Sequence, residues 1–197
     1  MSITVTDLCK NFGTKPVLHR FGFFLANGET VALMGPSGCG KTTFLRILMG
    51  LETPDAGIIE GLRGLRIAPV FQQDRLCPGL SALQNVLVAA AHPARMAAQA
   101  QQLLQELGLD ADEIQRPAAV LSGGQRRRAA LARAVLAEGD LVLLDEAFKG
   151  LDEATAAQAI RFVQHHTKGK MVLAVTHSAS EAAALGARIV QMPAKPN

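Results

Sequence analysis

One glycine-rich stretch, GPSGCGKTT at residues 35–43, constrains the fold more than any other part of the chain. It matches without exception the pattern of a glycine, four variable residues, a second glycine, Lys and then Ser or Thr. The preceding run TVALM has the character of a buried strand, and apolar residues from Leu45 onward recur with helical spacing until Gly50 ends the pattern. A glycine loop between a strand and a helix is typical of a phosphate site, because backbone N–H groups and the positive end of the helix point at one anion.

The residue types within this loop indicate what it would hold. Its glycines let backbone N–H groups close around phosphate oxygens. Lys41 adds a positive charge, and Thr42 offers a hydroxyl to Mg²⁺. Cys39 occupies a variable position of the pattern, and we interpret it as a small residue with no redox role. The loop therefore predicts a site for the phosphates of a nucleotide.

Strand and helix patterns alternate along the two outer parts of the chain, whereas the middle part is helical. An alternating strand begins near Ile3, and the runs RIAPVF, LVLLD, MVLAVT and RIVQM are further strand candidates, the first of them ending at Gln72. The middle part opens with a capping-box pattern at Ser81 and Gln84. This predicts an α/β fold: a P-loop NTPase core at residues 1–73 and 122–197 with a mostly parallel sheet, an N-terminal antiparallel β part, and an inserted helical subdomain at 74–121. Residues 193–197 read as a short tail.

The composition excludes several classes of protein. The net charge is only +3, there is no Trp or Tyr, and the one basic cluster, Arg126 to Arg128, is expected to be a solvated or salt-bridged helix face, so we expect no nucleic-acid partner. The three cysteines are widely spaced, which indicates a reducing compartment. The chain has no signal-peptide pattern and no apolar run near the ~20 residues that span a bilayer. We therefore expect a cytoplasmic protein.

Polar residues follow three of the predicted strands. Asp145 and Glu146 close LVLLDE, Gln72 ends RIAPVFQ, and His177 follows MVLAVT. The carboxyl ends of parallel strands lie at one edge of a sheet, where ligands bind. There Asp145 would suit Mg²⁺ and Glu146 would polarise an attacking water. Each residue also has a simpler interpretation, as a charged turn, a solvated amide or a structural histidine.

A second glycine turn, Ser122-Gly123-Gly124, stands before the helical pattern QRRRAALARAVL. Its first backbone N–H groups have no partner inside the helix, so it is a second potential anion site. The simpler interpretation is that Ser122 is an N-cap, which contributes ~1 kcal/mol to helix stability. The two interpretations are compatible.

Taken in order, these motifs resemble the ATP-binding subunit of ABC transporters. The order is GPSGCGKTT at 35–43, Gln72, LSGGQ at 121–125, LVLLDE at 141–146, a Leu-Asp pair at 151–152, and His177. The resemblance covers nearly the whole chain, and LSGGQ together with a phosphate loop is highly specific. It implies an enzyme that hydrolyses ATP to ADP and phosphate with the help of Mg²⁺.

The resemblance also implies a role for each residue that matches the family's motifs. Glu146 would be the general base, His177 would contact the γ-phosphate, and Phe12 would stack on adenine. The catalytic group would be Glu146, His177 and Gln72, and Mg²⁺ would be held by Thr42, Gln72 and Asp145. The phosphates would lie on Gly35, Pro36, Ser37, Gly38, Cys39, Gly40, Lys41, Thr42 and Thr43.

The second glycine turn would serve a second copy of the chain. Two copies would pack head to tail, so that Leu121, Ser122, Gly123, Gly124 and Gln125 of one cover the γ-phosphate on Lys41 of the other. Asp152 would contact the partner copy. Each ATP would then lie between two helix N-termini, and loss of the γ-phosphate would loosen the dimer.

The family also implies partners in a membrane. Residues 74–121 would contact integral membrane permease subunits, which would hold the chain at the inner face of the cell membrane, and a solute-binding protein would deliver the cargo. The stretch FQQDRLCPGLSALQNV is similar to importers of nitrate, sulfonates, taurine and other small solutes, so we expect import. A soluble ABC ATPase of the cofactor-assembly type, or one for lipoprotein release or cell division, stays open as an alternative.

Some positions depart from the family's pattern. Ala147 stands where the family often has Pro, Lys149 and Gly150 stand where Ser and Ala are usual, and the segment 57–66 is short. Gly150 loosens the backbone, and Lys149 adds charge near the expected dimer contact. These departures concern the coupling of the two sites rather than ATP binding.

Overall fold

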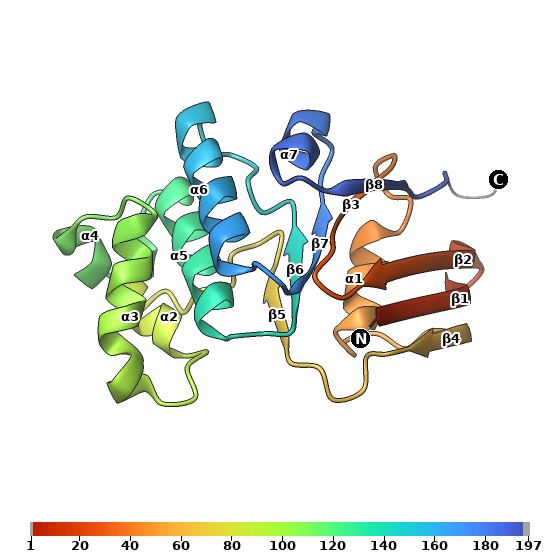
Figure 1. Cartoon of the computed structure of the whole chain (residues 1–197), viewed down its shortest axis with the longest axis horizontal. Helices are drawn as coiled ribbons and strands as arrows, with labels where there is room; N and C mark the ends of the chain where they lie inside the picture. Colours follow the sequence, from red (N-terminus) through yellow and green to blue (C-terminus); the bar gives the residue numbers. More distant parts are fainter. Residues whose placement is uncertain (1, 195–197) are drawn as a thin grey trace.

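A five-stranded parallel sheet forms the centre of the protein in the computed structural model, which describes residues 2–194 (Figure 1). Its strands run in the order β5-β6-β7-β3-β8, and each neighbouring pair is parallel. They are β3 (Thr30–Met34), β5 (Ile67–Val70), β6 (Leu141–Asp145), β7 (Met171–Val175) and β8 (Arg188–Gln191). Because the strands are parallel, their carboxyl ends meet at one edge of the sheet.

Both faces of the central strands of this sheet are buried, because their alternate residues enter two different cores. In β6, Val142 and Leu144 pack with α5 (Gly123–Leu136) and α6 (Glu153–His166), whereas Leu141 and Leu143 pack on the opposite side. All residues of β6 and β7 are buried. Such strands have no solvated face, so charged groups are confined to their ends.

A second, antiparallel sheet packs on the opposite side of the parallel sheet from α5 and α6. Its order is β2-β1-β4, with β1 (Ser2–Phe12), β2 (Lys15–Ala26) and β4 (Ala56–Glu60). The helix α1 (Lys41–Leu48) joins this sheet to the core, since the Phe44 ring lies 5.1 Å from Phe21 and 5.2 Å from Phe23 between centroids. The predicted N-terminal antiparallel part is therefore confirmed, although the sequence did not predict β4.

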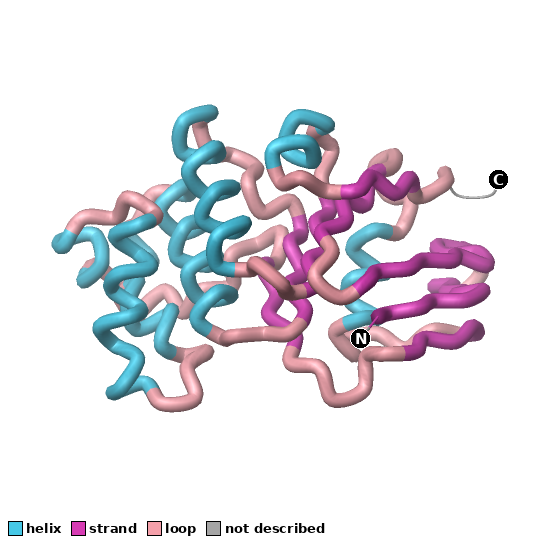
Figure 2. The backbone as a smooth tube through the Cα atoms, viewed as in Figure 1, coloured by secondary structure: helices cyan, strands magenta, loops and turns pink. Residues whose placement is uncertain are grey.

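A block of helices lies at the far side of α5 from the antiparallel sheet (Figure 2). It contains α2 (Ala82–Leu87), α3 (Pro93–Glu106), α4 (Ala111–Gln115) and the 3₁₀ turn η1 (Ala118–Val120). The predicted capping box begins α2, because Ser81 Oγ accepts from the Gln84 N–H at 3.2 Å and the Gln84 side chain accepts from the Ser81 N–H at 2.9 Å. The described residues thus give the predicted fold class, a mixed α/β core with helices inserted midway.

One strand end differs from the sequence prediction, and part of the predicted tail lies outside the described residues. The strand β5 ends at Val70, so Gln72 lies in the loop after it rather than on the strand. The helix α7 (Ala179–Ala184) and β8 close the described chain, and the last three residues of the predicted tail lie outside it. Within residues 2–194, each helix is too short or too polar to cross a membrane.

Candidate active site

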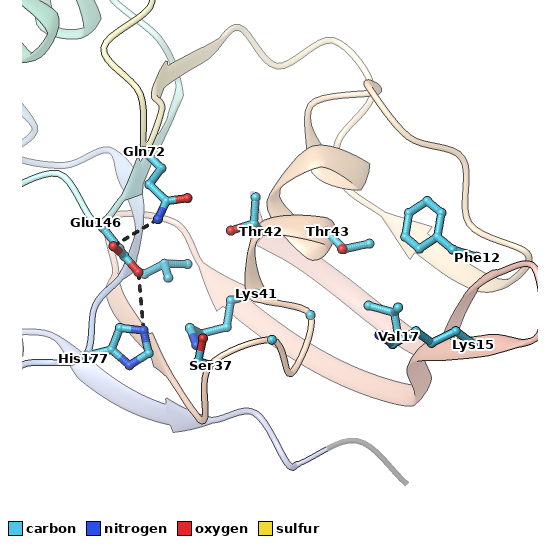
Figure 3. A pocket seen from close by; sticks show the side chains of 13 residues that line it. Phe12, Lys15, Val17, Ser37, Lys41, Thr42, Thr43, Gln72, Glu146 and His177 are labelled. Carbon is cyan, nitrogen blue, oxygen red and sulfur yellow. Dashed lines mark hydrogen bonds and ion pairs between the residues drawn. The ribbon is translucent and has the colours of Figure 1, made fainter. Parts of the chain in front are cut away.

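A pocket of about 440 Å³ opens at the carboxyl edge of the parallel sheet (Figure 3). Gln72, Glu146 and His177 lie on one side of it, and Phe12 lies on the other, with the glycine-rich loop between them. Its lining consists of Phe12, Lys15, Val17, Ser37, Gly38, Gly40, Lys41, Thr42, Thr43, Gln72, Glu146, Val175 and His177. The pocket therefore joins both sheets and the ends of four parallel strands, β3, β5, β6 and β7.

The glycine-rich loop closes tightly around the side chain of Lys41. Gly40 adopts φ +112°, and a Cβ there would lie 2.9 Å from the backbone carbonyl oxygen of Val17, so the position requires glycine. Lys41 is buried, and its Nζ donates hydrogen bonds to the carbonyls of Gly35 at 2.8 Å and Pro36 at 3.0 Å. The loop thus holds an ammonium group at the base of the pocket.

Three residues of the predicted phosphate loop lie outside the pocket lining. Gly35 and Pro36 contribute the carbonyls that accept from Lys41, and Cys39 is buried among apolar residues of the core. The Cys39 side chain therefore packs in the core, which agrees with its interpretation as a small packing residue.

Asp145, the last residue of β6, lies beside the first turn of α1. Thr42 Oγ1 donates a hydrogen bond to Asp145 Oδ2 at 3.2 Å. Burial raises the pKa of the Asp145 carboxyl, and the hydrogen bond from Thr42 opposes that rise. Residues 2–194 contain no group of three or more His, Cys, Asp or Glu that could hold a metal ion. A hydroxyl and a buried carboxylate beside a phosphate loop fit the oxygen ligands that Mg²⁺ prefers.

Glu146 is turned into the pocket by an unusual backbone conformation. Its φ is +49°, in the left-handed region that residues other than glycine rarely adopt. Its N–H donates to the carbonyl of Val175 at 3.0 Å, which ties the end of β6 to the end of β7. Such conformations are found where the surrounding structure enforces them, often in active sites.

The Glu146 carboxylate contacts three side chains from three different segments. Gln72 Nε2 donates to its Oε2 at 3.3 Å, Lys149 Nζ lies 2.8 Å from the same oxygen, and His177 Nε2 lies 3.4 Å from Oε1. The hydrogen bond from Lys149 lowers the pKa of the Glu146 carboxyl, and partial burial opposes this shift. Glu146 is therefore ionised at neutral pH and able to accept a proton.

Gln72 and His177 both reach the Glu146 carboxylate at the pocket (Figure 3), so neither side chain is without a protein partner. The contact between Lys149 and Glu146 was not predicted. The sequence signal for this contact was that Lys149 follows Glu146 by three residues, a spacing that brings two side chains close together in a turn.

The wall opposite Glu146 comes from the β1–β2 hairpin. Phe12 is 50% exposed and pairs with Lys15 in the ladder, while Lys10 Nζ lies 5.2 Å from the centroid of the Phe12 ring. The half-exposed ring lines the pocket, and an aromatic ring at such a position suits stacking of a flat group. The sequence predicted Phe12 here but missed Lys15 and Val17, because their place in the wall depends on the hairpin pairing.

The second glycine turn lies outside this pocket, since none of the residues 121–125 lines it. Ser122 begins α5 in a capping box, with its Oγ accepting from the Gln125 N–H at 3.2 Å and its N–H donating to the Gln125 side chain at 2.6 Å. The N-cap interpretation is therefore confirmed. The Leu121 side chain is 4% exposed and packs in the core, so it is not available to a nucleotide.

Arg126 to Arg128 do not form a solvated helix face, which was one of the two interpretations of this arginine run. Arg127 is buried and pairs with Asp74, Nε to Oδ1 at 3.1 Å. Arg126 bonds the carbonyl of Leu121, and Arg128 bonds the carbonyl of Gly108 at 2.9 Å. The three side chains point in different directions, and each donates hydrogen bonds to other groups of the protein. The sequence could not show this, because the partners come from distant segments.

The geometry defines a class of protein before any comparison is made: a P-loop nucleotide-binding cassette with an acidic residue poised at the phosphate loop. The chain belongs to the ABC transporter family, since the family profile described as "ABC transporter" matches residues 18–149. ATP-binding subunits of this family are ATPases. The predictions of an ATP-binding ABC subunit and of ATPase activity are therefore confirmed.

The alignments with named relatives extend over nearly all of this chain. The aliphatic sulfonates import ATP-binding protein SsuB 1 of Nocardia farcinica is 43% identical over 194 residues, which span 96% of this chain and 77% of that protein. The taurine import ATP-binding protein TauB of Pseudomonas aeruginosa is 40% identical, over 92% of this chain and 73% of that protein. The SsuB protein of Burkholderia ambifaria is also 40% identical, over 96% of this chain but only 60% of its own length.

Two solved structures of the cassette MJ0796 share the fold. Its dimeric structure, described as a bacterial ABC transporter cassette, aligns with a TM-score of 0.87 at 28% identity over 97% of this chain and 94% of that one. A dimeric post-hydrolysis state of the same cassette, bound to ADP and Pi, aligns with a TM-score of 0.87 at 28% identity over 98% and 97%. The predicted fold class is confirmed by this similarity.

The tight packing around Gly40 gives a prediction about the loop. Gly40→Ala should lower the free energy of unfolding by roughly 2 kcal/mol or more, because it combines a left-handed backbone with steric overlap. Gly38→Ala is the matched control: its φ is +74°, and an added Cβ would meet nothing within 4 Å. It should cost only about 1 kcal/mol. Urea unfolding measures both, and equal losses would contradict the packing described here.

Proposed function

We propose that this chain is the ATP-hydrolysing subunit of an importer for a small solute, and that it works as a head-to-tail dimer. The observation that carries this proposal is the arrangement of Glu146, Gln72 and His177 around the pocket of the phosphate loop. The names of the relatives support import over the alternatives of cofactor assembly, lipoprotein release or cell division. No observation favours those alternatives.

Each residue of the pocket takes the role that its position allows. The amides of the loop 35–43 and Lys41 bind the phosphates, and the exposed ring of Phe12 stacks on the base. Glu146 acts as the general base, because it is ionised and lies with Gln72 and His177 at the mouth of the loop. His177 then contacts the γ-phosphate.

Mg²⁺ fits the group formed by Thr42, Gln72 and Asp145. Thr42 and Asp145 are already joined by a hydrogen bond, and both of them and Gln72 line a second hollow beside the phosphate loop. A bound magnesium ion would neutralise phosphate charge during transfer. The buried Asp145 carboxylate supplies the negative charge that holds such an ion in place.

The second glycine turn supports the dimer. Gly123 has an ordinary backbone conformation, and a Cβ there would meet nothing within 4 Å, so the single chain has no need of glycine at this position. A glycine in open space fits the close approach of an external group, and the turn presents helix N–H groups to an anion. Ser122, Gly123, Gly124 and Gln125 would thus cover the partner's γ-phosphate, and the MJ0796 cassette, to which this chain is similar in fold, is described as dimeric.

Asp152 is proposed to contact the partner copy. In the single chain its carboxylate caps α6, accepting from the Thr155 N–H at 3.0 Å and from Thr155 Oγ1 at 2.6 Å. This cap fixes the end of the loop that joins Glu146 to α6.

The membrane partner is proposed to be an integral permease that binds the helical part 74–121 and holds the chain at the inner face of the membrane. A groove of about 310 Å³ lies there, lined by Asp74, Arg75, Leu76, Pro78, Ala118, Ala119 and Arg126. The relatives are named for aliphatic sulfonates and taurine, so we propose an alkanesulfonate as cargo, delivered by a solute-binding protein.

The role of Glu146 gives a sharp test. Glu146→Gln should lower kcat by at least ~100-fold while ATP still binds, because the amide keeps the shape but loses the base. In gel filtration with ATP the variant should run as a dimer. Glu153→Gln, which changes an exposed carboxylate in the first turn of α6, is the control and should hydrolyse normally. Rapid turnover by Glu146→Gln would exclude its role as base.

The turn at Ser122 can be separated from its capping function in the background of Glu146→Gln. Ser122→Ala removes only the cap and should keep part of the ATP-dependent dimer, because the N–H groups stay open. Ser122→Arg fills the turn and should eliminate the dimer, whereas ATP binding to the single chain stays unchanged. Equal behaviour of the two variants in gel filtration would show that Ser122 acts as a cap alone.

The permease surface can be tested with two matched substitutions. Val120 is 68% exposed beside the groove of the helical part, and Ile58 is 63% exposed on the distant antiparallel sheet. Val120→Glu should abolish co-purification of an integral membrane protein after crosslinking in native membranes, and Ile58→Glu should leave it unchanged. Loss in both variants, or in neither, would place the permease elsewhere.

A further inference from the structure

Two arginines of α5 fasten the loop 71–75 to that helix. Arg127 donates from Nη1 to the carbonyl of Phe71 at 2.8 Å and from Nη2 to the carbonyl of Gln72 at 2.6 Å. Arg133 donates to the carbonyls of Asp74 and Arg75, both at 2.8 Å. The two guanidinium groups therefore donate hydrogen bonds to four of the five carbonyls of the loop 71–75.

The contacts of Arg127 are the stronger constraint, because one buried group makes all of them. Its side chain is 11% exposed, and its Nε also pairs with the Asp74 carboxylate, whose side chain is 17% exposed. Its two hydrogen bonds to carbonyls are charge-assisted and therefore strong, and the ion pair with Asp74 adds a third contact to the planar group. Without Arg127, the Asp74 carboxylate would be partly buried with no close ion-pair partner.

This fastening connects two regions that the proposed function treats separately. Arg127 lies just over one helical turn from Ser122, where α5 begins at the second glycine turn. The backbone of Gln72 is fixed to Arg127, while its side chain reaches Glu146 at 3.3 Å. A continuous series of contacts thus runs from the Ser122 turn through Arg127 and Gln72 to the Glu146 carboxylate.

We propose that Arg127 is a positioning residue for ATP hydrolysis. It makes the loop of Gln72 move with α5, so that binding of the Ser122 turn to the partner's γ-phosphate sets the contact between Gln72 and Glu146. This inference rests on the proposed function of Glu146 and of the Ser122 turn. It assigns to Arg127 no contact with ATP, because Arg127 does not line the pocket.

The chain offers a matched control one residue away. Arg128 lies on the same helix and donates to the carbonyls of Leu107 and Gly108, both at 2.9 Å, at the end of α3. It fastens α5 to the helical part but makes none of the contacts with the loop of Gln72. A comparison of Arg127 with Arg128 therefore separates positioning of Gln72 from general anchoring of α5.

The test is a double-mutant cycle with Gln72. Arg127→Met should lower kcat about tenfold, with the KM for ATP changed by less than about twofold, because Arg127 places Gln72 but does not line the ATP pocket. Arg127→Lys, which keeps the charge but not the planar fork, should recover part of this loss. Arg128→Met should leave kcat within about twofold of the parent chain. In the background of Gln72→Ala, Arg127→Met should cause no further loss.

A second measurement reports the loop without relying on turnover. The sequence contains no Trp, so Gln73→Trp, at an exposed position beside Gln72, gives a single fluorescent probe of this loop. In the Glu146→Gln background, ATP should change its emission, and Arg127→Met should remove that change while ATP still binds. Thermal unfolding confirms that each variant is folded, and Arg127→Lys serves for both measurements if Arg127→Met does not fold.

The outcomes that overturn the proposal are distinct from those that overturn the function. Additive losses in the cycle with Gln72, or equal losses in Arg127→Met and Arg128→Met, would show that Arg127 only stabilises α5. An unchanged ATP response of the Trp probe in Arg127→Met would exclude the proposed link. Rapid hydrolysis by Glu146→Gln would instead contradict the role of Glu146 itself.

Discussion

Burial of both faces of the parallel sheet is the constraint on which the site depends. The strands β6 and β7 have no solvated side, so a charged group within them would lose its hydration without compensation. Charged and polar groups can stand only where the strands end. Because the strands are parallel, these ends meet at one edge, which brings Lys41, Gln72, Glu146 and His177 together from four distant segments.

The same edge gives two neighbouring carboxylates opposite properties. Asp145 still belongs to β6 and points toward Thr42, where burial raises its pKa. Glu146 has left the strand with a left-handed backbone and points toward Lys149, whose ammonium group lowers its pKa. Glu146 therefore stays ionised, whereas burial deprives the Asp145 carboxylate of hydration that a nearby cation could replace. The turn of the backbone between them separates the two environments.

Local patterns made much of this site predictable. The phosphate loop, the capping box at Ser81 and the N-cap at Ser122 depend on residues within a few positions of one another, so their sequence patterns sufficed. The strand ends depend on hydrophobic runs, which are also local. By contrast, β4 is a mostly exposed strand that exists through its pairing with β1, and its own residues give a weak pattern. The burial of Arg127 depends on carbonyls 55 and 56 residues away, which no local pattern can show.

The two glycine turns differ in a way that bears on the dimer. The turn before α1 is filled from within, because Lys41 occupies it and Leu18 closes on Gly40. The turn before α5 has open space at Gly123, so packing within one chain does not explain a glycine there. In the proposed dimer the partner's phosphate would approach at this point. A single anion would then act on its own loop directly and on the partner's Gln72 through Arg127, which links closure of the dimer to arrangement of the base.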